Sequence, residues 1–244
     1  MTAPSRERLE GDRVVLPDHA AFVEAAAGKI ATTLARVVQA RGRCSVALAG
    51  GATPRPVYAC LARAPLVGQV GWEQIDLYFT DERCVPPDDP GSNYRMVAES
   101  LLSGVPGLAA RTHLMQGERR DRDAAASDYE RVLPARLDLM LLGVGPDGHT
   151  ASLFPRSPAL DERVRRVVAV RGPTPPALRL TITPPVIAAA ETVVVLVSGG
   201  EKAPAVARAL AGPYQPREVP SQLALHGDWV MDAAAAAAWR SRAP

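Results

Sequence analysis

The chain has 244 residues, 47% of them hydrophobic, so it can bury a large core and fits one domain, 1–244, better than two. Its 28 basic and 26 acidic residues give a net charge of +2, which is too small to indicate a nucleic-acid partner, and no basic run is interleaved with aromatic residues. The three cysteines are widely spaced and form no C-x-x-C pair, which favours a reducing compartment and argues against a disulfide framework.

Residues 1–13 contain no apolar segment of the kind found in signal peptides. No apolar stretch approaches the roughly 18–20 residues that a membrane span requires. We therefore expect a cytoplasmic protein without membrane contact.

From residue 13 onwards, short apolar runs typical of strands alternate with segments whose apolar residues recur at helical spacing. The predicted strands cover residues 13–16, 45–48, 75–79, 137–142, 167–170, 192–197 and 229–231. The predicted helices cover residues 18–41, 54–62, 93–102, 124–133, 201–210 and 232–240, with Asp18 and Asp232 as expected N-caps. This alternation predicts an α/β fold, with a mostly parallel sheet and helices on both of its faces.

The most informative segment is 137–155, LDLMLLGVGPDGHTASLFP. An apolar run closed by glycines is typical of a strand that is buried on both faces of a parallel sheet. The glycines allow a sharp turn, and Asp147 and His149 follow where the strand stops. Since ligands of open α/β sheets bind beyond the carboxyl ends of the strands, this titratable pair lies where such folds carry out their chemistry.

Gly143, Gly145 and Gly148 also spell G-x-G-x-x-G, the dinucleotide fingerprint. That fingerprint requires a long following helix and an acidic residue about 20 positions further on. Here Pro155 interrupts the chain soon after the glycines, and Arg171 follows the next apolar run. Because an arginine could contact a 2′-phosphate, NADP binding stays open as an alternative.

Three further predicted strands end in loops of similar character. These loops read AGGATP after 45–48, TDER after 75–79 and SGGEK after 192–197. If the strands are parallel, all four loops lie along one edge of the sheet and some of them converge.

The first of these loops resembles a phosphate cradle. Gly50, Gly51, Ala52 and Thr53 precede Pro54, which suits the first position of a helix. Glycines allow close backbone approach, and the free N–H groups at a helix N-terminus bind anions. A plain strand-to-helix turn is the equally open alternative.

Two of the other loops carry cations. Lys202, one of only two lysines, follows two glycines at the predicted start of a helix. A cation is disfavoured there unless an anion is bound, so Lys202 is a candidate phosphate ligand, against the alternative of a solvated surface lysine. Asp81 and Arg83 directly follow a buried strand and are candidate substrate-binding residues, since arginine can grip phosphate or carboxylate with two parallel hydrogen bonds. Ser92 and Asn93 are interpreted as caps of the next helix.

Other classes of site find less support. No H-x-x-x-H or similar spacing of metal ligands occurs, so we expect neither a metal nor a cofactor. A G-x-S-x-G elbow is also absent from the sequence, which disfavours a serine hydrolase.

Five blocks of sequence resemble one known family. LAGGATP, TDERCVPPDDPGSNYRM, LGVGPDGHTASLFP, RLTITPPVI and VSGGEKA, in this order and spacing, resemble the 6-phosphogluconolactonase family over residues 13–240. The resemblance implies a Rossmann-like α/β fold and metal-free hydrolysis of 6-phospho-D-glucono-1,5-lactone to 6-phosphogluconate in the pentose phosphate pathway. The implied partners are this sugar-phosphate lactone and, through coupled function, glucose-6-phosphate dehydrogenase.

Carried over position by position, the resemblance makes His149 the general base on water and Asp147 its orienting partner. Arg83 and Lys202 would hold the phosphate or the developing negative charge. The turn at 50–53 would supply backbone donors.

The chain departs from the family's usual S-G-G-S-T-P at Ala49 and Ala52. Two hydroxyl groups are therefore missing, and phosphate binding at this turn would depend on backbone N–H groups and Thr53.

Two rivals remain. Glucosamine-6-phosphate deaminases share the fold and a D-G-H block, but there the block continues to a glutamate whose place is taken here by Phe154. A non-catalytic sugar-phosphate sensor usually carries a DNA-binding segment, and the sequence shows none.

Overall fold

The computed structural model describes residues 11–105 and 107–241. Its centre is a six-stranded parallel sheet with the strand order β1-β9-β8-β5-β2-β3. These strands are β1 (Arg13–Leu16), β2 (Cys44–Leu48), β3 (Ile75–Phe79), β5 (Leu139–Gly143), β8 (Thr192–Val197) and β9 (Asp228–Asp232). The four apolar residues of β5 are fully buried, as predicted for a strand covered on both faces.

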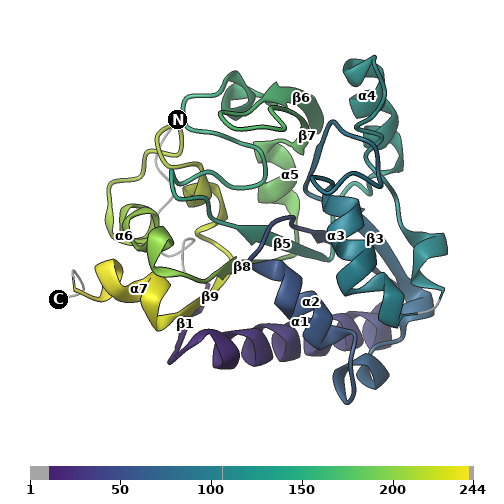
Figure 1. Ribbon diagram of the computed structural model, residues 1–244, viewed down its shortest axis with the longest axis horizontal. Coiled ribbons are helices and arrows are strands. Elements are labelled where there is room, and N and C mark those ends of the chain that lie inside the picture. Colours follow the sequence, from purple (N-terminus) through teal and green to yellow (C-terminus); the bar gives the residue numbers. More distant parts are fainter. Residues whose placement is uncertain (1–10, 106, 242–244) are drawn as a thin grey trace.

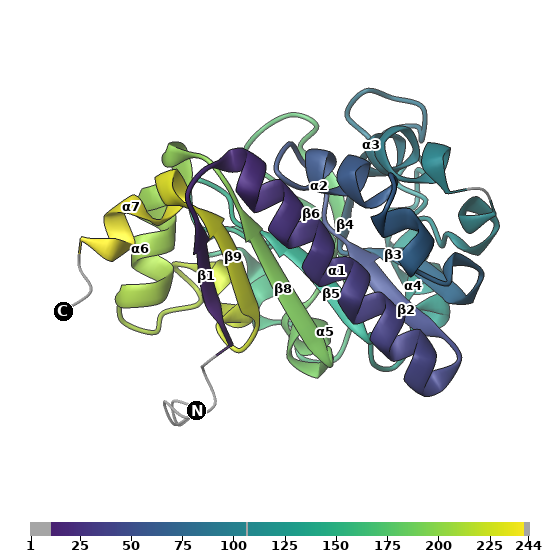
Figure 2. The same cartoon turned by 90° about the horizontal axis from the view of Figure 1, so that it is seen from below.

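Helices lie on both sides of this sheet. They are α1 (His19–Arg41), α2 (Pro54–Leu61), α3 (Asn93–Ser100), α4 (Arg122–Val132), α5 (Pro184–Ala189), α6 (Ala203–Ala211) and α7 (Ala233–Arg240). Figures 1 and 2 place α1 and α2 on one side of the sheet and α5 on the other. Asp18 and Asp232 cap α1 and α7 with their side-chain oxygens, as predicted. The predicted fold class is confirmed.

The strand order produces a crevice between β2 and β5. From β2 the chain continues through α2 to β3, whereas from β5 it returns in the opposite direction to β8 and then β9. Because crossovers between parallel strands are right-handed, this reversal sends the two connections to opposite faces of the sheet. Ligands of open α/β folds bind at such a reversal. The two loops that flank it carry the turn at 50–53 and the Asp147–His149 pair.

A second, three-stranded antiparallel sheet begins just beyond the end of β3. Its order is β4-β7-β6, formed by β4 (Asp81–Arg83), β7 (Leu178–Ile182) and β6 (Val167–Arg171). The sequence predicted a loop at 81–83, and it predicted only the third of these strands. The other two were missed because β4 consists of charged residues and prolines precede and follow β7, which obscures the usual pattern of a strand.

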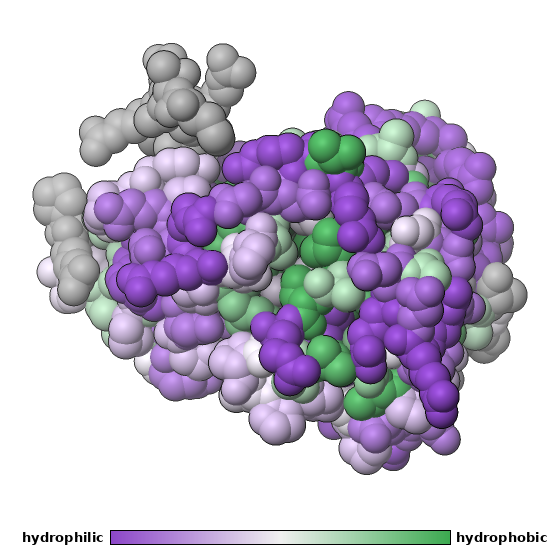
Figure 3. Space-filling model, turned by 90° about the horizontal axis from the view of Figure 1, so that it is seen from above, coloured by the Kyte–Doolittle hydropathy of each residue, from purple (hydrophilic) through white to green (hydrophobic). Residues whose placement is uncertain are grey.

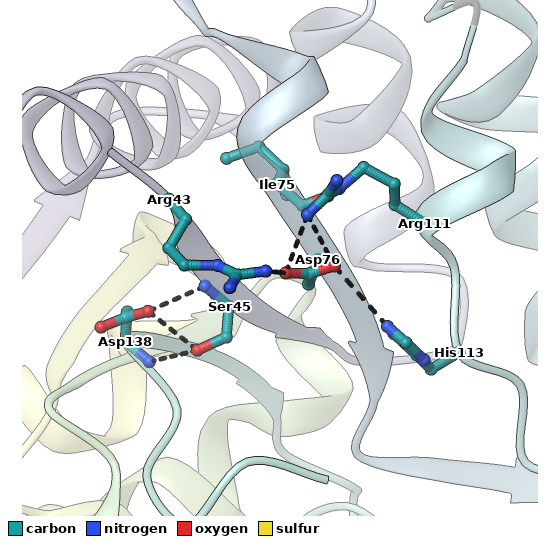
Figure 4. Close-up of polar contacts among 7 residues, drawn as sticks. All are labelled: Arg43, Ser45, Ile75, Asp76, Arg111, His113 and Asp138. Atoms are coloured by element: carbon teal, nitrogen blue, oxygen red, sulfur yellow. Dashed lines mark hydrogen bonds and ion pairs between the residues drawn. The ribbon is translucent and has the colours of Figure 1, made fainter. Parts of the chain in front are cut away.

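A separate polar cluster lies at the amino ends of the strands, away from the crevice (Figure 4). Asp138, just before β5, accepts hydrogen bonds of 2.8 Å from both the N–H and the hydroxyl of Ser45. Asp76 of β3 accepts hydrogen bonds from Arg43 (3.0 Å) and from Arg111 (3.0 and 3.1 Å). These contacts hold β2, β3 and β5 together at the amino edge of the sheet, opposite the edge that carries the loops of the crevice.

Large apolar side chains with substantial exposure are scattered over the described surface, at Val14, Leu114, Val132, Val164 and Tyr214. On the side away from α1, Figure 3 shows mostly hydrophilic residues around small, separate apolar groups. Within residues 11–105 and 107–241, no helix has the length and apolar character that a membrane crossing requires. The N-terminal stretch without a predicted signal peptide lies largely outside the described residues.

Candidate active site

The loops that were predicted to converge line one cleft at the carboxyl edge of the large sheet. The cleft has a volume of about 200 Å³. Its wall is formed by residues 49–54, 143–146, Asp81, Arg83, Asn93, His149, Ala151, Arg179, Glu201 and Lys202. Every candidate residue from the sequence therefore lines this cleft except Asp147, which reaches it through His149.

His149 and Asp147 form a hydrogen-bonded pair. The distance between His149 Nδ1 and Asp147 Oδ1 is 2.6 Å, and the backbone N–H of His149 donates to the same oxygen at 3.1 Å. An ionised carboxylate only accepts hydrogen bonds, so we assign the ring proton to Nδ1 and the lone pair to Nε2. Burial alone would raise the pKa of Asp147, but the hydrogen bond and charge of His149 lower it below its ordinary value. The pair is thus suited to present an unprotonated Nε2.

The glycine turn fixes the position of the imidazole. A Cβ at Gly145 would lie 2.1 Å from Cε1 and Nδ1 of His149, so only glycine lets the ring pack against this turn. The ring of Phe154 contacts the imidazole, with centroids 4.9 Å apart. Since residues 144–157 contain no helix, the turn lacks the helix of a dinucleotide site, and the glycine serves the histidine instead.

Asp81 is buried, and protein donors occupy its carboxylate. Its Oδ2 accepts a hydrogen bond from the hydroxyl of Ser152 (2.6 Å), and its Oδ1 accepts one from the amide of Asn93 (3.2 Å). Asn93 also donates to the backbone carbonyl of Asp81 (2.9 Å). Ser92 caps α3 as predicted, whereas the side chain of Asn93, expected to cap as well, lines the cleft.

Glu82, to which the sequence assigned no role, holds this wall together. Its buried carboxylate accepts hydrogen bonds from the N–H groups of Arg83 (2.6 Å), Asn93 (2.7 Å) and Tyr94 (2.8 Å). It also accepts one from the hydroxyl of Ser92 (3.1 Å). Burial raises the pKa of Glu82 above its ordinary value, although the three N–H donors oppose this. The carboxylate thus fastens β4 to the first turn of α3.

One end of the cleft carries two arginines. Arg83 and Arg179 are directly opposite each other in the antiparallel pair β4–β7, and both line the cleft. Backbone carbonyls orient them: Arg83 Nη1 donates to Gly91 (2.6 Å) and Arg179 Nε donates to Pro176 (3.2 Å). Burial lowers the pKa of Arg179, and the positive charge of Arg83 lowers it further.

The other end of the cleft carries Lys202. This residue precedes α6 directly, and its Nζ lies 3.9 Å from a carboxylate oxygen of Glu201, a weak contact. The lysine follows β8, whereas Arg83 follows β3. In the sheet, β5 and β2 lie between these two strands, so β8 and β3 are three strand spacings, or ~14 Å, apart. The cleft therefore has a cation at each end, with His149 on the loop of an intervening strand.

The turn at 50–53 lies between these ends and leads into α2. Thr53 stands at the N-cap position, but its side chain makes no capping hydrogen bond, so its hydroxyl is not committed to the helix. A Cβ at Gly50 would lie 1.9 Å from Oδ1 of Asn93. Gly50 thus makes room for the side chain of Asn93. The sequence did not reveal this reason for a glycine at position 50.

The donor groups of the cleft suit anions. Within the described residues, no group of three or more His, Cys, Asp or Glu side chains could hold a metal ion. Cys44, Cys60 and Cys84 are free thiols, and none of them lines the cleft. Burial raises the pKa of Cys44 to about 12, so this thiol is not a nucleophile at neutral pH.

The structure thus brings together His149, Asp81, Arg83, Lys202 and the turn at 50–53, all proposed from sequence. It adds residues to which the sequence gave no role in the cleft: Asn93, Arg179, Glu82 and Glu201. Arg179 belongs to the block RLTITPPVI, so the family resemblance carried a signal for it that the local pattern did not.

Comparison with known proteins agrees with this geometry. A family model for glucosamine-6-phosphate isomerases/6-phosphogluconolactonase matches residues 17–231. A 6-phosphogluconolactonase of Streptomyces coelicolor is 37% identical over 241 residues, covering 91% of this chain and 92% of that protein. One of Mycobacterium tuberculosis is 37% identical over 240 residues, covering 91% of this chain and 96% of that protein.

Solved structures show the same fold. A 6-phosphogluconolactonase from Trypanosoma brucei superposes with a TM-score of 0.83 at 27% identity, covering 96% of this chain and 100% of that chain. A monomeric glucosamine-6-phosphate deaminase superposes with a TM-score of 0.81 at 23% identity, covering 93% and 100%, which shows a shared fold alone. With residues 17–231 matched and these relatives covered almost throughout, the chain belongs to the glucosamine-6-phosphate isomerase/6-phosphogluconolactonase family.

Proposed function

We propose that this protein, acting as one domain, hydrolyses 6-phospho-D-glucono-1,5-lactone to 6-phosphogluconate. The observation that carries the proposal is the His149–Asp147 pair in a cleft with cations at both ends. The names of the bacterial relatives support the same substrate. This substrate has an ester that a neutral base can open with water and a phosphate that cations can hold.

In the proposed reaction, His149 Nε2 removes a proton from a water molecule, whose oxygen forms a bond to the lactone carbonyl carbon. The carbonyl oxygen then becomes a tetrahedral oxyanion. When this intermediate collapses, the bond to the ring oxygen breaks, and the imidazolium returns its proton to that oxygen. Asp147 stabilises the imidazolium and keeps Nδ1 protonated. General base catalysis of this kind contributes roughly 10²–10⁴-fold to the rate.

For the phosphate, we propose Lys202 and the turn at 50–53 as the principal ligands. The lysine directly precedes a helix and has only a weak contact with Glu201, so its charge is available to an anion. The turn offers backbone N–H groups and the uncommitted hydroxyl of Thr53. Asp81 supports the wall through Asn93 and Ser152.

A coupled assay tests the proposed activity, with glucose-6-phosphate dehydrogenase generating fresh lactone. We expect 6-phosphogluconate to form faster than the lactone opens unaided. Deamination would need a carboxylate to move protons between carbons, and Phe154 occupies the place of that glutamate. We therefore expect no ammonia from glucosamine 6-phosphate, and ammonia release at the rate of lactone turnover would contradict the proposal.

Two variants test the assigned residues. His149→Ala should lower kcat by roughly 10²–10⁴-fold with the fold intact, and a wild-type rate would remove His149 from the mechanism. Lys202→Ala should raise KM for the phosphorylated lactone far more than for unphosphorylated gluconolactone. An equal effect on both substrates would show that the lysine does not contact the phosphate.

Three further expectations belong to this proposal. The reaction is expected to proceed without a metal, the protein to act in the cytoplasm, and its flux to be coupled to that of glucose-6-phosphate dehydrogenase.

A further inference from the structure

Arg179 is the least expected residue of the cleft. It is 7% exposed, lines the wall beside Arg83, and was not among the candidate residues. We propose that Arg179, together with Arg83, binds the carbonyl oxygen of the lactone and the negative charge that develops on it, leaving the phosphate to Lys202. This inference rests on the proposed lactonase function and assigns the two cationic ends of the cleft to different parts of one substrate.

The first support is the pairing of two like charges. Residues directly opposite in an antiparallel pair have neighbouring side chains, and like charges at such positions destabilise the sheet. Among the described residues, neither Arg83 nor Arg179 forms an ion pair with a carboxylate, and the charge of Asp81 does not offset the lowering of the pKa of Arg179 by burial and by Arg83. Burying a guanidinium without a counter-ion is unfavourable, and a bound anion between the two arginines would remove that cost.

The second support is preorganisation. Backbone carbonyls of Pro176 (3.2 Å) and Thr174 (3.5 Å) accept hydrogen bonds from Nε and Nη2 of Arg179, and Gly91 accepts one from Arg83. These carbonyls fix the guanidinium planes without neutralising their charge. Donors that are already in place stabilise a developing oxyanion most effectively, because nothing has to reorganise during the reaction.

The third support is the position relative to the base. The ring of Phe154 lies 4.9 Å from the imidazole of His149 and 5.5 Å from Cζ of Arg179, measured to the ring centroid. Base and guanidinium therefore contact the same phenyl ring. The proposal places the carbonyl oxygen of a lactone attacked by water at His149 on the side of this arginine.

The fourth support is the separation of the two cationic ends. Lys202 follows a strand that is three spacings, or ~14 Å, from the strand that leads to Arg83. In the lactone ring, the carbonyl carbon and the carbon that carries the phosphorylated CH₂ group flank the ring oxygen, so the carbonyl oxygen and the phosphate project to different sides. The long side chains of Arg179 and Lys202, which both line the cleft, can approach these groups from its two ends. One end of the cleft can therefore hold the phosphate while the other holds the reacting carbonyl.

The water oxygen bonds to the carbonyl carbon, and the π electrons of the carbonyl move to its oxygen, where Arg179 and Arg83 bind the charge. Collapse restores the carbonyl and expels the ring oxygen, which receives the proton held by His149. The carboxylic acid formed in this way loses its remaining proton to solvent, and the carboxylate of the product then remains opposite Arg179.

This last point gives a direct test by titration calorimetry with two probes that share a phosphate. 6-Phosphogluconate has a carboxylate at the far end, whereas glucitol 6-phosphate has an alcohol there. Arg179→Gln should weaken binding of 6-phosphogluconate by roughly 10- to 100-fold and leave binding of glucitol 6-phosphate unchanged. Lys202→Gln should weaken both. Equal weakening of both ligands by Arg179→Gln, or of neither, would overturn the assignment.

Kinetics give an independent readout. Arg179→Gln should lower kcat by roughly 10²–10³-fold, equally for the phosphorylated lactone and for glucono-1,5-lactone. A rise in KM confined to the phosphorylated substrate would make Arg179 a phosphate ligand instead. Arg179→Lys keeps the charge and serves if the glutamine variant fails to fold; it should retain part of the affinity for 6-phosphogluconate.

Arg171→Gln is the matched control, since Arg171 is an exposed arginine in the same small sheet that does not line the cleft. It should match wild type in both experiments. Wild-type turnover of the lactone tests the proposed function itself. If the wild-type protein does not hydrolyse the lactone, the proposed function is wrong. If the wild type is active and Arg179→Gln behaves like it, only the role of Arg179 is wrong.

Discussion

Replacing Gly50 by alanine should disrupt the wall of the cleft through a single side chain. The new Cβ would lie 1.9 Å from Oδ1, 2.1 Å from Cγ and 2.4 Å from Nδ2 of Asn93. The buried amide would have to leave, and with it the hydrogen bonds to the carbonyl (2.9 Å) and carboxylate (3.2 Å) of Asp81. One neutral and one charge-assisted hydrogen bond correspond to about 2–4 kcal/mol. For a chain of this size the melting temperature should fall by about 4–16 °C.

A double-mutant cycle followed by thermal unfolding measures this coupling. Asn93→Ala removes the amide, so Gly50→Ala should cost far less in that background than in wild type. Gly28→Ala is the control, because a Cβ there meets nothing within 4 Å and alanine favours a helix. Additive effects of the two cleft substitutions would refute the proposed contact between Gly50 and Asn93.

Three other perturbations test other parts of the structure. Asp147→Asn should lower kcat by roughly 10²–10⁴-fold by favouring the wrong tautomer of His149, and an unchanged kcat in the coupled assay would contradict this. Exhaustive dialysis against EDTA should leave turnover unchanged; a loss that Zn²⁺ or Mg²⁺ restores would show a metal requirement. Burial would raise the pKa of Asp76, but Arg43 and Arg111 lower it below its ordinary value. Ionised Asp76 therefore contributes its full stabilisation at a pH above the ordinary aspartate pKa of about 3.9. This stabilisation is lost as the pH falls through the lower pKa that Asp76 has in the folded protein. In this acidic range, the stability of Asp76→Asn, measured by denaturation, should therefore depend less on pH than that of wild type.

Local sequence patterns predicted the parts of the fold that depend on neighbours in the chain. The apolar run before the D-G-H block became the fully buried strand β5, and Asp18 and Asp232 cap the helices that they precede. The convergence of four loops followed from strand direction alone, because parallel strands present their carboxyl ends at one edge. His149 and Lys202 could therefore be placed in the cleft from the sequence.

Contacts between distant segments were not predictable in this way. Arg83 meets Arg179 because two short strands pair in antiparallel fashion. The residues of β4 are all charged, and β7, although its apolar residues alternate, lies between prolines. Gly50 packs against Asn93, which follows a different loop. From the sequence, Gly50 was therefore assigned to phosphate binding alone. The sequence assigned no role to Glu82, yet its carboxylate is buried among backbone donors of the next helix. In each case the partner determines the role of the residue.

The residue at position 154 shows how one fold can serve two reactions. The resemblance to the deaminases aligns Phe154 with a glutamate of theirs, whereas here the ring of Phe154 lies against both His149 and Arg179. A carboxylate at this position would stand close to the guanidinium and would neutralise the charge that an oxyanion requires. A phenyl ring instead holds the guanidinium by a cation–π contact, which orients the arginine and leaves its charge available to the substrate. Under the proposed function, a phenyl ring in place of an acid at position 154 therefore both disfavours deamination and keeps the charge of Arg179 for the lactone carbonyl.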